Sequence, residues 1–314
     1  MQHRALGHTG LKVSRLGLGT WLWGTQVDQH EARDQLAAFV DAGGTLVDTA
    51  VGYGGGASEE LLGKLLRDVV PREQVVLATK GGFRRTPSGG VRDTSRRALL
   101  QDLDVSLDRL GVDHVDLFQV HVWSDSAPVE ETMAALDQAV ASGRARYVGV
   151  SNYAGWQLAQ AATWQHAVAT RVPLASTQEE YSLLHRELEH DVLPAAAATG
   201  LGVLAYSPLG GGVLTGKYRT GTPSDSRGAG PLAAGVDRFL DEHGRAVVEG
   251  VARAADGLGW TPLQVALLWV RDRPGVAAAL VGARTAAQLE AALTTDELTL
   301  PAEITAALDD VSGD

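Results

Sequence analysis

The sequence of 314 residues contains no cysteine. Disulfide bonds, thiolate nucleophiles and cysteine-ligated metal sites are therefore excluded, and no spacing of histidines or carboxylates suggests another metal site. Long apolar runs are also missing, since none approaches the roughly 18 residues of a membrane-spanning helix. The opening MQHRALGHTG lacks the charged and apolar regions of a secretory signal. We expect a soluble, cytoplasmic protein with no metal and no membrane partner.

Lysine and asparagine are scarce as well. Only four of the 27 basic residues are lysines, and one of them, Lys80, ends an apolar run. The only asparagine, Asn152, follows another such run. Acidic residues outnumber basic residues by 38 to 27, and no basic cluster stands out. Nucleic acid and anionic membrane surfaces are therefore not expected as partners.

Short apolar runs alternate with helical segments along most of the chain. Strands are predicted at residues 16–19, 46–48, 75–79, 115–120, 147–150, 174–177, 203–205 and 277–281. Helices are predicted at residues 31–41, 59–67, 96–110, 130–142, 156–168, 188–198 and 262–271. This alternation is typical of α/β proteins with parallel strands and right-handed crossovers. Eight units favour a closed (β/α)8 TIM barrel over a doubly wound sheet, which the periodicity would also fit.

Four additions complete this predicted single domain of residues 1–314. Residues 3–13 are predicted to form an N-terminal β-hairpin that covers one end of the fold. Residues 210–236 are a long, glycine-rich irregular stretch, for which we favour a lid over a disordered loop. An extra helix is predicted at 239–255, before the last βα unit, and a C-terminal helix at 303–311.

Polar residues follow the predicted strands at their C-terminal ends, where α/β barrels carry their active sites. In chain order they are Asp48, Lys80, His121, Ser151, Asn152, Gln178, Tyr206, Ser207, Gly282 and Arg284. Residues 45–66 add Tyr53 on a glycine-rich turn, followed by a helix that Ser58 is predicted to cap. Each residue alone is more often structural than functional, but a barrel would gather all of them at one mouth.

Eight segments spread over the whole chain resemble the aldo-keto reductases, in the branch that includes bacterial general-stress reductases and potassium-channel β subunits. They are SRLGLGTWLWG, DTAVGYGGGASEELLGKLL, ATKGG, LFQVHVW, GVSNY, QEEYSLLHRE, GVLAYSPLGGGVLTGKY and LVGARTAAQLEAAL. The resemblance implies a barrel that binds NADP(H) without a Rossmann domain and reduces aldehydes or ketones. No G-x-G-x-x-G lies between a strand and a helix, which agrees with that implication.

The resemblance places a catalytic tetrad on Asp48, Tyr53, Lys80 and His121. Tyr53 is expected to be the general acid, with the charge of Lys80 lowering the pKa of its phenol from the usual value of about 10. Asp48 is expected to keep Lys80 charged. His121 is expected to orient the carbonyl as a neutral imidazole.

The cofactor residues follow from the same resemblance. Those matched to the nicotinamide end are Ser151, Asn152, Gln178 and Tyr206, the last as a ring that stacks on the nicotinamide. Those matched to the phosphates and the adenine are Ser207, Leu209, Gly211, Lys217, Gly282, Arg284, Thr285 and Gln288.

Arg284 lies before a helix N-terminus, which suits a 2′-phosphate and favours NADP over NAD. Relatives commonly have asparagine where this chain has Ala292, which puts the adenine contacts in doubt. Arg227 is expected either to fold over the cofactor or to be solvated.

The seven tryptophans divide by position. Trp21, Trp23 and Trp123 follow predicted strands and are expected to wall a substrate pocket that favours apolar or aromatic carbonyls. The tryptophans on predicted helices are expected to be packing residues, and these are Trp156, Trp164, Trp260 and Trp269.

Two other functions fit part of the pattern. A cofactor-binding regulatory subunit would share the barrel and the cofactor site, but a complete tetrad favours a catalyst. A barrel lyase or isomerase would explain neither Arg284 nor the solitary Asn152. The predicted function is therefore NADP(H)-dependent reduction of a small-molecule carbonyl substrate.

Overall fold

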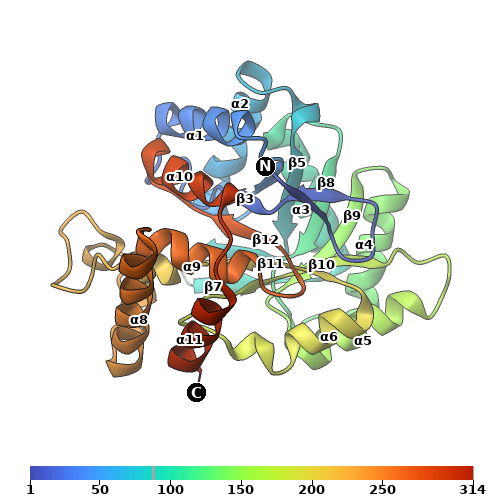
Figure 1. Cartoon of the computed structure of the whole chain (residues 1–314). Coiled ribbons are helices and arrows are strands. Elements are labelled where there is room, and N and C mark those ends of the chain that lie inside the picture. Colours follow the sequence, from blue (N-terminus) through green and yellow to red (C-terminus); the bar gives the residue numbers. More distant parts are fainter. Residues whose placement is uncertain (87–88, 314) are drawn as a thin grey trace.

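Eight parallel strands close into a barrel at the centre of the structure, a computed structural model that describes residues 1–86 and 89–313 (Figure 1). The strands are β3 (Leu16–Gly19), β4 (Leu46–Asp48), β5 (Val76–Gly81), β8 (Val115–Val120), β9 (Ala145–Ser151), β10 (Leu174–Glu180), β11 (Gly202–Tyr206) and β12 (Val276–Val281). Strand β12 pairs with β3 and so closes the ring, with Ala279 opposite Leu16. The predicted (β/α)8 barrel is confirmed, and the doubly wound alternative is excluded.

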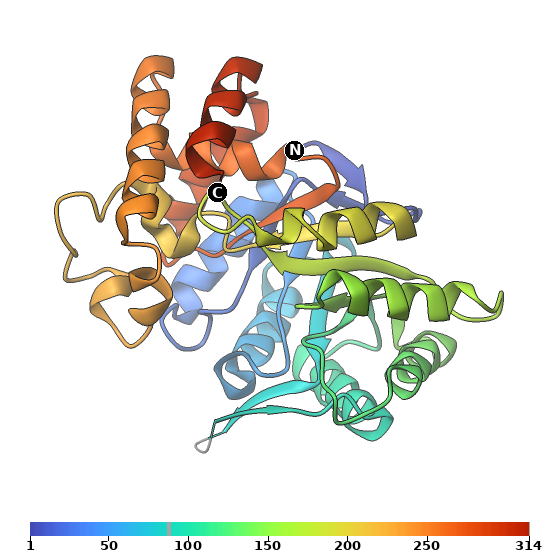
Figure 2. The ribbon, with the colours of Figure 1, turned by 90° about the horizontal axis from the view of Figure 1, so that it is seen from below.

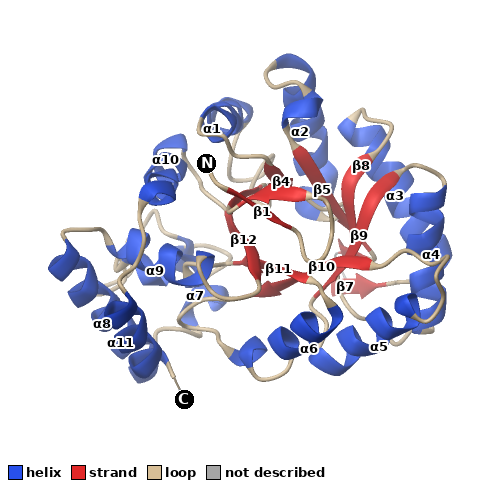
Figure 3. Ribbon diagram, turned by 45° about the vertical axis from the view of Figure 1, so that its right-hand side comes forward, coloured by secondary structure: helices blue, strands red, loops and turns tan. Residues whose placement is uncertain are grey.

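Helices surround the ring of strands (Figure 3). They are α1 (Gln29–Asp41), α2 (Ala57–Asp68), α3 (Arg96–Leu110), α4 (Val129–Ala141), α5 (Gly155–His166), α6 (Val192–Thr199), α9 (Pro262–Arg271) and α10 (Ala286–Leu293). Each buries an apolar face against the strands, as α2 does with Leu62, Leu65 and Leu66. The main apolar core therefore lies between the barrel and the helices. In the described residues no helix is long and apolar enough to cross a membrane.

The predicted N-terminal hairpin is present and plugs one end of the barrel. Strands β1 (His3–Ala5) and β2 (Lys12–Ser14) pair antiparallel, and Leu6 and Val13 are fully buried in an apolar cluster inside the barrel. Ser14 Oγ accepts a hydrogen bond from the Thr45 N–H at 2.9 Å, just before β4 begins. A Cβ at Gly7 would lie 2.5 Å from the Gly200 carbonyl oxygen, so the turn fits only because it is glycine. The hairpin thus seals the N-terminal end of the strands.

Additional elements separate β11 from β12, as the sequence predicts. After an irregular segment come the short α7 (Ala234–Asp237) and the longer α8 (Glu242–Leu258), against which the C-terminal α11 (Ala302–Ser312) packs (Figure 2). The extra helix begins at Glu242 rather than at the predicted residue 239, because Asp241 caps it by accepting the Gly244 N–H at 2.8 Å. Helix α6 begins later than predicted as well, since residues 187–189 form a separate 3-10 turn.

Two local features differ from the sequence predictions. A β-hairpin, β6 (Phe83–Thr86) and β7 (Gly89–Arg92), projects from the barrel after β5 (Figure 2). Its glycines and arginines carry little strand propensity, which is why the sequence did not indicate it. Ser58 does not cap α2, whose N-cap is Gly56; its hydroxyl instead lies 2.8 Å from that of Thr20 and 3.0 Å from that of Thr49.

The hairpin plug leads to a test of stability. We expect Leu6→Ala to lower the free energy of unfolding by roughly 2–5 kcal/mol, because it opens a cavity at a fully buried site. Urea unfolding measures this loss. Val168→Ala, at an exposed position, is the control and should change stability by less than about 0.5 kcal/mol. An equal loss of unfolding free energy in both variants would contradict the role of the hairpin as a plug that stabilises the barrel.

Candidate active site

A cavity of about 930 Å³ opens at the C-terminal ends of the strands, opposite the hairpin plug. Most of the predicted site residues line it, and these are Trp21, Asp48, Tyr53, His121, Ser151, Asn152, Gln178, Tyr206, Ser207, Leu209, Gly211, Lys217, Gly282, Arg284 and Gln288. Arg227 and Ala292 line it as well. Lys80 lies beneath the cavity floor, 1 % exposed. The structure therefore brings residues from the ends of all eight barrel strands to one site.

Asp48 and Lys80 form a buried ion pair at the floor of the cavity. Lys80 Nζ donates to both carboxylate oxygens of Asp48, at 2.8 and 2.6 Å, and to the Thr49 carbonyl at 2.9 Å. Burial lowers the pKa of Lys80, and the adjacent Asp48 opposes that change. Gln178 Nε2 also donates to Asp48, at 2.9 Å. All three ammonium hydrogens of Lys80 are thus engaged.

Tyr53 lies above this pair on a short 3-10 helix, Tyr53–Gly56, that follows β4. Lys80 Nζ is 5.1 Å from the centre of its ring. Burial, and secondly the negative charge of Asp48, raise the pKa of Tyr53 well above 10. This direction is opposite to the predicted lowering by Lys80, because burial and the charge of Asp48 both raise the pKa of the phenol. Tyr53 is a neutral phenol that can donate a proton.

His121 follows β8 and faces Tyr53. Its ring meets those of Tyr53 and Phe83 edge-on, with centroids 5.8 and 5.5 Å apart. Burial, together with the charge of Lys80, lowers the pKa of His121 to about 3, so the imidazole is neutral above that pH. Nδ1 is buried without a hydrogen-bond partner among the described residues. The proton therefore belongs on Nε2, because an unpaired N–H would cost more than an unpaired acceptor.

Side chains at the ends of β9, β10 and β11 are linked to one another. Asn152 Nδ2 donates to the His121 carbonyl and to Ser151 Oγ, both at 3.0 Å, and Asn152 Oδ1 accepts from the Tyr206 hydroxyl at 2.8 Å. Ser151 Oγ donates to the Gln178 carbonyl at 2.7 Å. Among the described residues only Asn152 and Ser207 have a positive φ without being glycine, at 56° and 53°. Such strain is typical of functional sites.

The other end of the cavity is cationic. Lys217, Arg227 and Arg284 all line it, and none of them forms an ion pair within the part of the chain that the structure describes. Arg227 stacks on Trp21, with its guanidinium carbon 5.2 Å from the ring centre, and Arg284 donates to the Asp225 carbonyl. The residues at 210–212 are successive glycines with positive φ, a backbone that often forms an anion-binding concavity. This end is suited to a phosphate-bearing ligand.

The irregular segment at 210–236 forms one wall of the cavity through Arg227, Leu232 and Gly235. Just beyond it, Arg238 forms an ion pair with Glu180 at the end of β10, and both residues line the cavity. Neither this pair nor Phe83 can be recognised from the sequence, because each becomes part of the site only through tertiary contacts.

Several predicted site residues lie elsewhere. Trp23 is fully buried, and its indole donates to Gln35 at 3.0 Å, so it is a packing residue rather than a pocket wall. Trp123 lies outside the cavity lining and contacts Tyr153 edge-on, with ring centroids 5.1 Å apart. Thr285 is the N-cap of α10, where its hydroxyl accepts the Gln288 N–H at 3.3 Å.

The tryptophans expected to pack also differ. Trp269 is buried, and Trp164 and Trp260 pack at the edge of the core. Trp156 is 63 % exposed, contrary to its predicted packing role, and its ring meets only that of Trp123 among the described aromatic residues, with centroids 5.6 Å apart.

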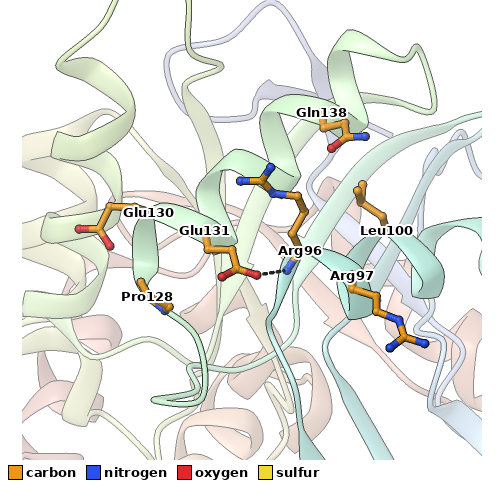
Figure 4. A pocket seen from close by; sticks show the side chains of 7 residues that line it. All are labelled: Arg96, Arg97, Leu100, Pro128, Glu130, Glu131 and Gln138. Carbon is orange, nitrogen blue, oxygen red and sulfur yellow. Dashed lines mark hydrogen bonds between the residues drawn. The ribbon is translucent and has the colours of Figure 1, made fainter.

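A second depression, of about 790 Å³, lies on the outer surface between α3 and α4 (Figure 4). Arg96 and Arg97 lie on one side of it, and the Arg96 backbone N–H donates to Glu131 at 3.0 Å. None of the predicted site residues lines this depression. The barrel mouth is therefore the candidate active site.

Sequence comparison agrees with this geometry. Residues 15–312 match the family described as "Aldo/keto reductase family". The chain belongs to this family. Membership in the aldo/keto reductases supports an oxidoreductase activity.

Three curated aldo/keto reductase relatives illustrate the breadth of the family. The chain is 37% identical to "Aldo-keto reductase YhdN" of Bacillus subtilis (strain 168), over 93% of this chain and 87% of that protein. It is 36% identical to "Probable voltage-gated potassium channel subunit beta" of Oryza sativa subsp. japonica, over 90% and 87%. It is also 36% identical to "L-glyceraldehyde 3-phosphate reductase" of Escherichia coli O157:H7, over 92% and 86%.

The buried imidazole predicts how the stability of this aldo/keto reductase depends on pH. The pKa of His121 is about 3 in the folded protein and about 6.5 in the unfolded chain. As the pH falls, the unfolded state therefore takes up a proton on this ring before the folded state does. The stability due to the neutral ring is present above pH 6.5 and is lost as the pH falls toward 3. We expect His121→Asn to reduce the slope of stability against pH in this window by up to about 1.4 kcal/mol per pH unit.

Urea unfolding at a series of pH values measures that slope. His30→Asn is the control, because the His30 side chain is 79% exposed. An unchanged slope in the His121 variant would show that this imidazole is not held neutral.

Proposed function

We propose that this protein reduces aldehydes or ketones to alcohols with NADPH as the hydride donor. The observation that carries the proposal is a single cavity with two different ends. A neutral phenol and a neutral imidazole face each other at one end, and at the other lie three cations that form no ion pair with the described residues. The first end suits a carbonyl oxygen that gains negative charge, and the second suits the phosphates of a dinucleotide.

The residues along the cavity fit the parts of NADPH. The amides of Asn152 and Gln178, with the Ser151 hydroxyl, offer donors and acceptors for a carboxamide, and the Tyr206 ring offers a surface for stacking. The lining residues suited to the phosphates and the adenine side are Ser207, Leu209, Gly211, Lys217, Arg227, Gly282, Arg284 and Gln288, and Thr285 caps the helix that follows Arg284. The small side chain of Ala292 leaves that part of the wall without a polar group for the adenine. When bound, NADPH supplies the hydride that adds to the carbonyl carbon.

Tyr53 donates the proton in this proposal. Negative charge grows on the carbonyl oxygen during reduction, and the resulting alkoxide is a far stronger base than a phenolate. A phenol whose pKa is raised by burial is therefore still acidic enough, and it stays protonated over the whole physiological range. Water then returns a proton to the phenolate, with the ammonium of Lys80 nearby to stabilise the charge.

His121 and the cavity walls orient the substrate. With its proton on Nε2, His121 donates a hydrogen bond to the same oxygen and favours the developing charge. Phe83 lines the cavity edge-on to His121, and Trp21 lines it where Arg227 stacks on its ring, so apolar or aromatic carbonyl compounds fit best.

The first test is the oxidation of NADPH, followed at about 340 nm (the band of the reduced nicotinamide) with aromatic aldehydes, aliphatic aldehydes and sugars. We expect turnover by the wild type and a loss of at least about 100-fold in Tyr53→Phe, because only the proton donor is removed. Cofactor binding by tryptophan quenching should stay the same in both proteins. Tight binding without turnover by the wild type on any compound would favour a regulatory, cofactor-binding role.

Cofactor preference tests the cationic end. We expect Arg284→Ala to weaken NADPH binding by roughly 10- to 100-fold, since a hydrogen bond to a charged group is lost. NADH binding, which involves no 2′-phosphate, should change by less than about threefold. Arg219→Ala is the control, because that guanidinium pairs with Glu249 outside the cavity lining. Equal losses for the two cofactors would remove Arg284 from the 2′-phosphate site.

A further inference from the structure

The backbone turn between β9 and α5 is held at every residue. The Asn152 N–H donates to the Gln178 carbonyl at 3.1 Å. The next three N–H groups donate to side chains: Tyr153 to Glu179 Oε1 at 3.3 Å, Ala154 to Gln157 Oε1 at 2.9 Å, and Gly155 to Asp191 Oδ2 at 2.7 Å. Three separate side chains therefore determine the path of four residues.

The first residue of this turn needs that support. Asn152 has a φ of 56°, which an L-residue adopts at a cost. In this conformation its side chain reaches both the His121 carbonyl and the Tyr206 hydroxyl. If Asn152 relaxed to a negative φ, its Cβ would turn about the N–Cα bond, the Tyr153 N–H would move with the chain, and the side-chain amide would leave both partners. The geometry of the nicotinamide end of the cavity thus depends on how the Tyr153 N–H is held.

Glu179, which accepts the Tyr153 N–H, lies in an unusual environment for a carboxylate. On β10 the side chain of Gln178 points into the barrel toward Asp48, so Glu179 points outward beneath the turn. The carboxyl is 7% exposed and accepts the Thr177 hydroxyl at 2.5 Å. Within the described residues it has no ion-pair partner. A buried carboxylate without a cation lowers stability, so packing alone does not account for it.

We propose that Glu179 is a positioning residue for the nicotinamide end of the site, acting through the Tyr153 N–H to fix Asn152 in its left-handed conformation. The effect on catalysis rests on the function proposed above. The effect on the conformation of Asn152 does not, and it can be measured in the protein alone.

Asn152 is the only asparagine in the sequence, and this allows a direct readout. Labelling with [15N]asparagine gives one backbone amide signal and one side-chain amide pair, all from Asn152. We expect a single sharp set in the wild type and in Glu179→Gln, whose amide oxygen still accepts a hydrogen bond. In Glu179→Met, which is similar in size but has no acceptor, we expect the set to shift and to broaden or split.

Kinetic measurements should follow the same order. Glu179→Met is expected to weaken NADPH binding and to lower kcat, each by about tenfold, which is the value of one lost hydrogen bond that holds the site. Glu179→Gln should remain within about twofold of the wild type. The matched control is Gln157→Met, which removes the acceptor of the next N–H but leaves the Tyr153 contact intact. It should leave the Asn152 signals and NADPH binding unchanged.

The pH dependence of the Asn152 signals gives a second readout that needs no methionine variant. Burial raises the pKa of Glu179 to about 7, so the wild-type signals should shift with a midpoint near pH 7, and Glu179→Gln should abolish that shift. The ionisable groups that face Glu179 are Asp191, Tyr153 and Tyr206. Burial raises the pKa of both tyrosines, so they remain neutral at pH 7. Asp191 is still present in Glu179→Gln, so any change of the Asn152 signals with pH that comes from Asp191 would persist in that variant.

Two results would overturn the positioning role. One is an unchanged set of Asn152 signals in Glu179→Met. The other is an equal disturbance in Gln157→Met, which would mean that any loss of support loosens the turn. A wild type that neither binds NADPH nor reduces carbonyl compounds would refute the proposed function instead, and the response of the Asn152 signals to Glu179 would still decide the conformational role.

Discussion

The buried ion pair between Asp48 and Lys80 constrains the rest of the site. Two charges inside a barrel lose most of their hydration, so each depends on the other, and removal of one partner from such a pair typically costs 3–5 kcal/mol. Lys80 uses all its hydrogens on Asp48 and Thr49, which ties the end of β5 to the end of β4. Gln178 adds β10 to the same carboxylate. Three strands are thus fixed to one another directly below the turn that carries Tyr53.

This pair also lies close to two titratable side chains that burial keeps neutral. Burial raises the pKa of the Tyr53 phenol, and the nearby negative charge of Asp48 raises it further. His121 is also buried, and the nearby positive charge of Lys80 further disfavours its protonation. Both groups are therefore hydrogen-bond donors without a formal charge. Within the described residues, the cavity-lining cations that form no ion pair are Lys217, Arg227 and Arg284, at its opposite end.

The sequence predicted the parts of this arrangement that follow from periodicity and barrel topology. The strands end where polar residues begin, so a parallel barrel must gather Asp48, His121 and Asn152 at one mouth. The sequence could not predict features that depend on contacts between residues far apart in the chain. Trp23 follows a strand as Trp21 does, yet only its contact with Gln35 reveals that it is buried. The rise of the Tyr53 pKa depends on burial and on the nearby charge of Asp48, and the role proposed for Glu179 depends on the turn after β9 that folds over it.

The strained turns at the C-terminal end of the barrel depend on the packing at its N-terminal end. Asn152 and Ser207, after β9 and β11, both adopt left-handed backbone conformations, each at a cost of about 1–3 kcal/mol. Such conformations persist only where the surrounding structure overdetermines them. Here the support is a closed ring of parallel strands, and its opposite end is filled by Leu6 and Val13. Without that plug, water would reach the N-terminal ends of the strands and weaken the apolar packing inside the ring. The hairpin therefore supports the geometry of the candidate site without contacting it, because the strained turns persist only while the whole barrel is stable.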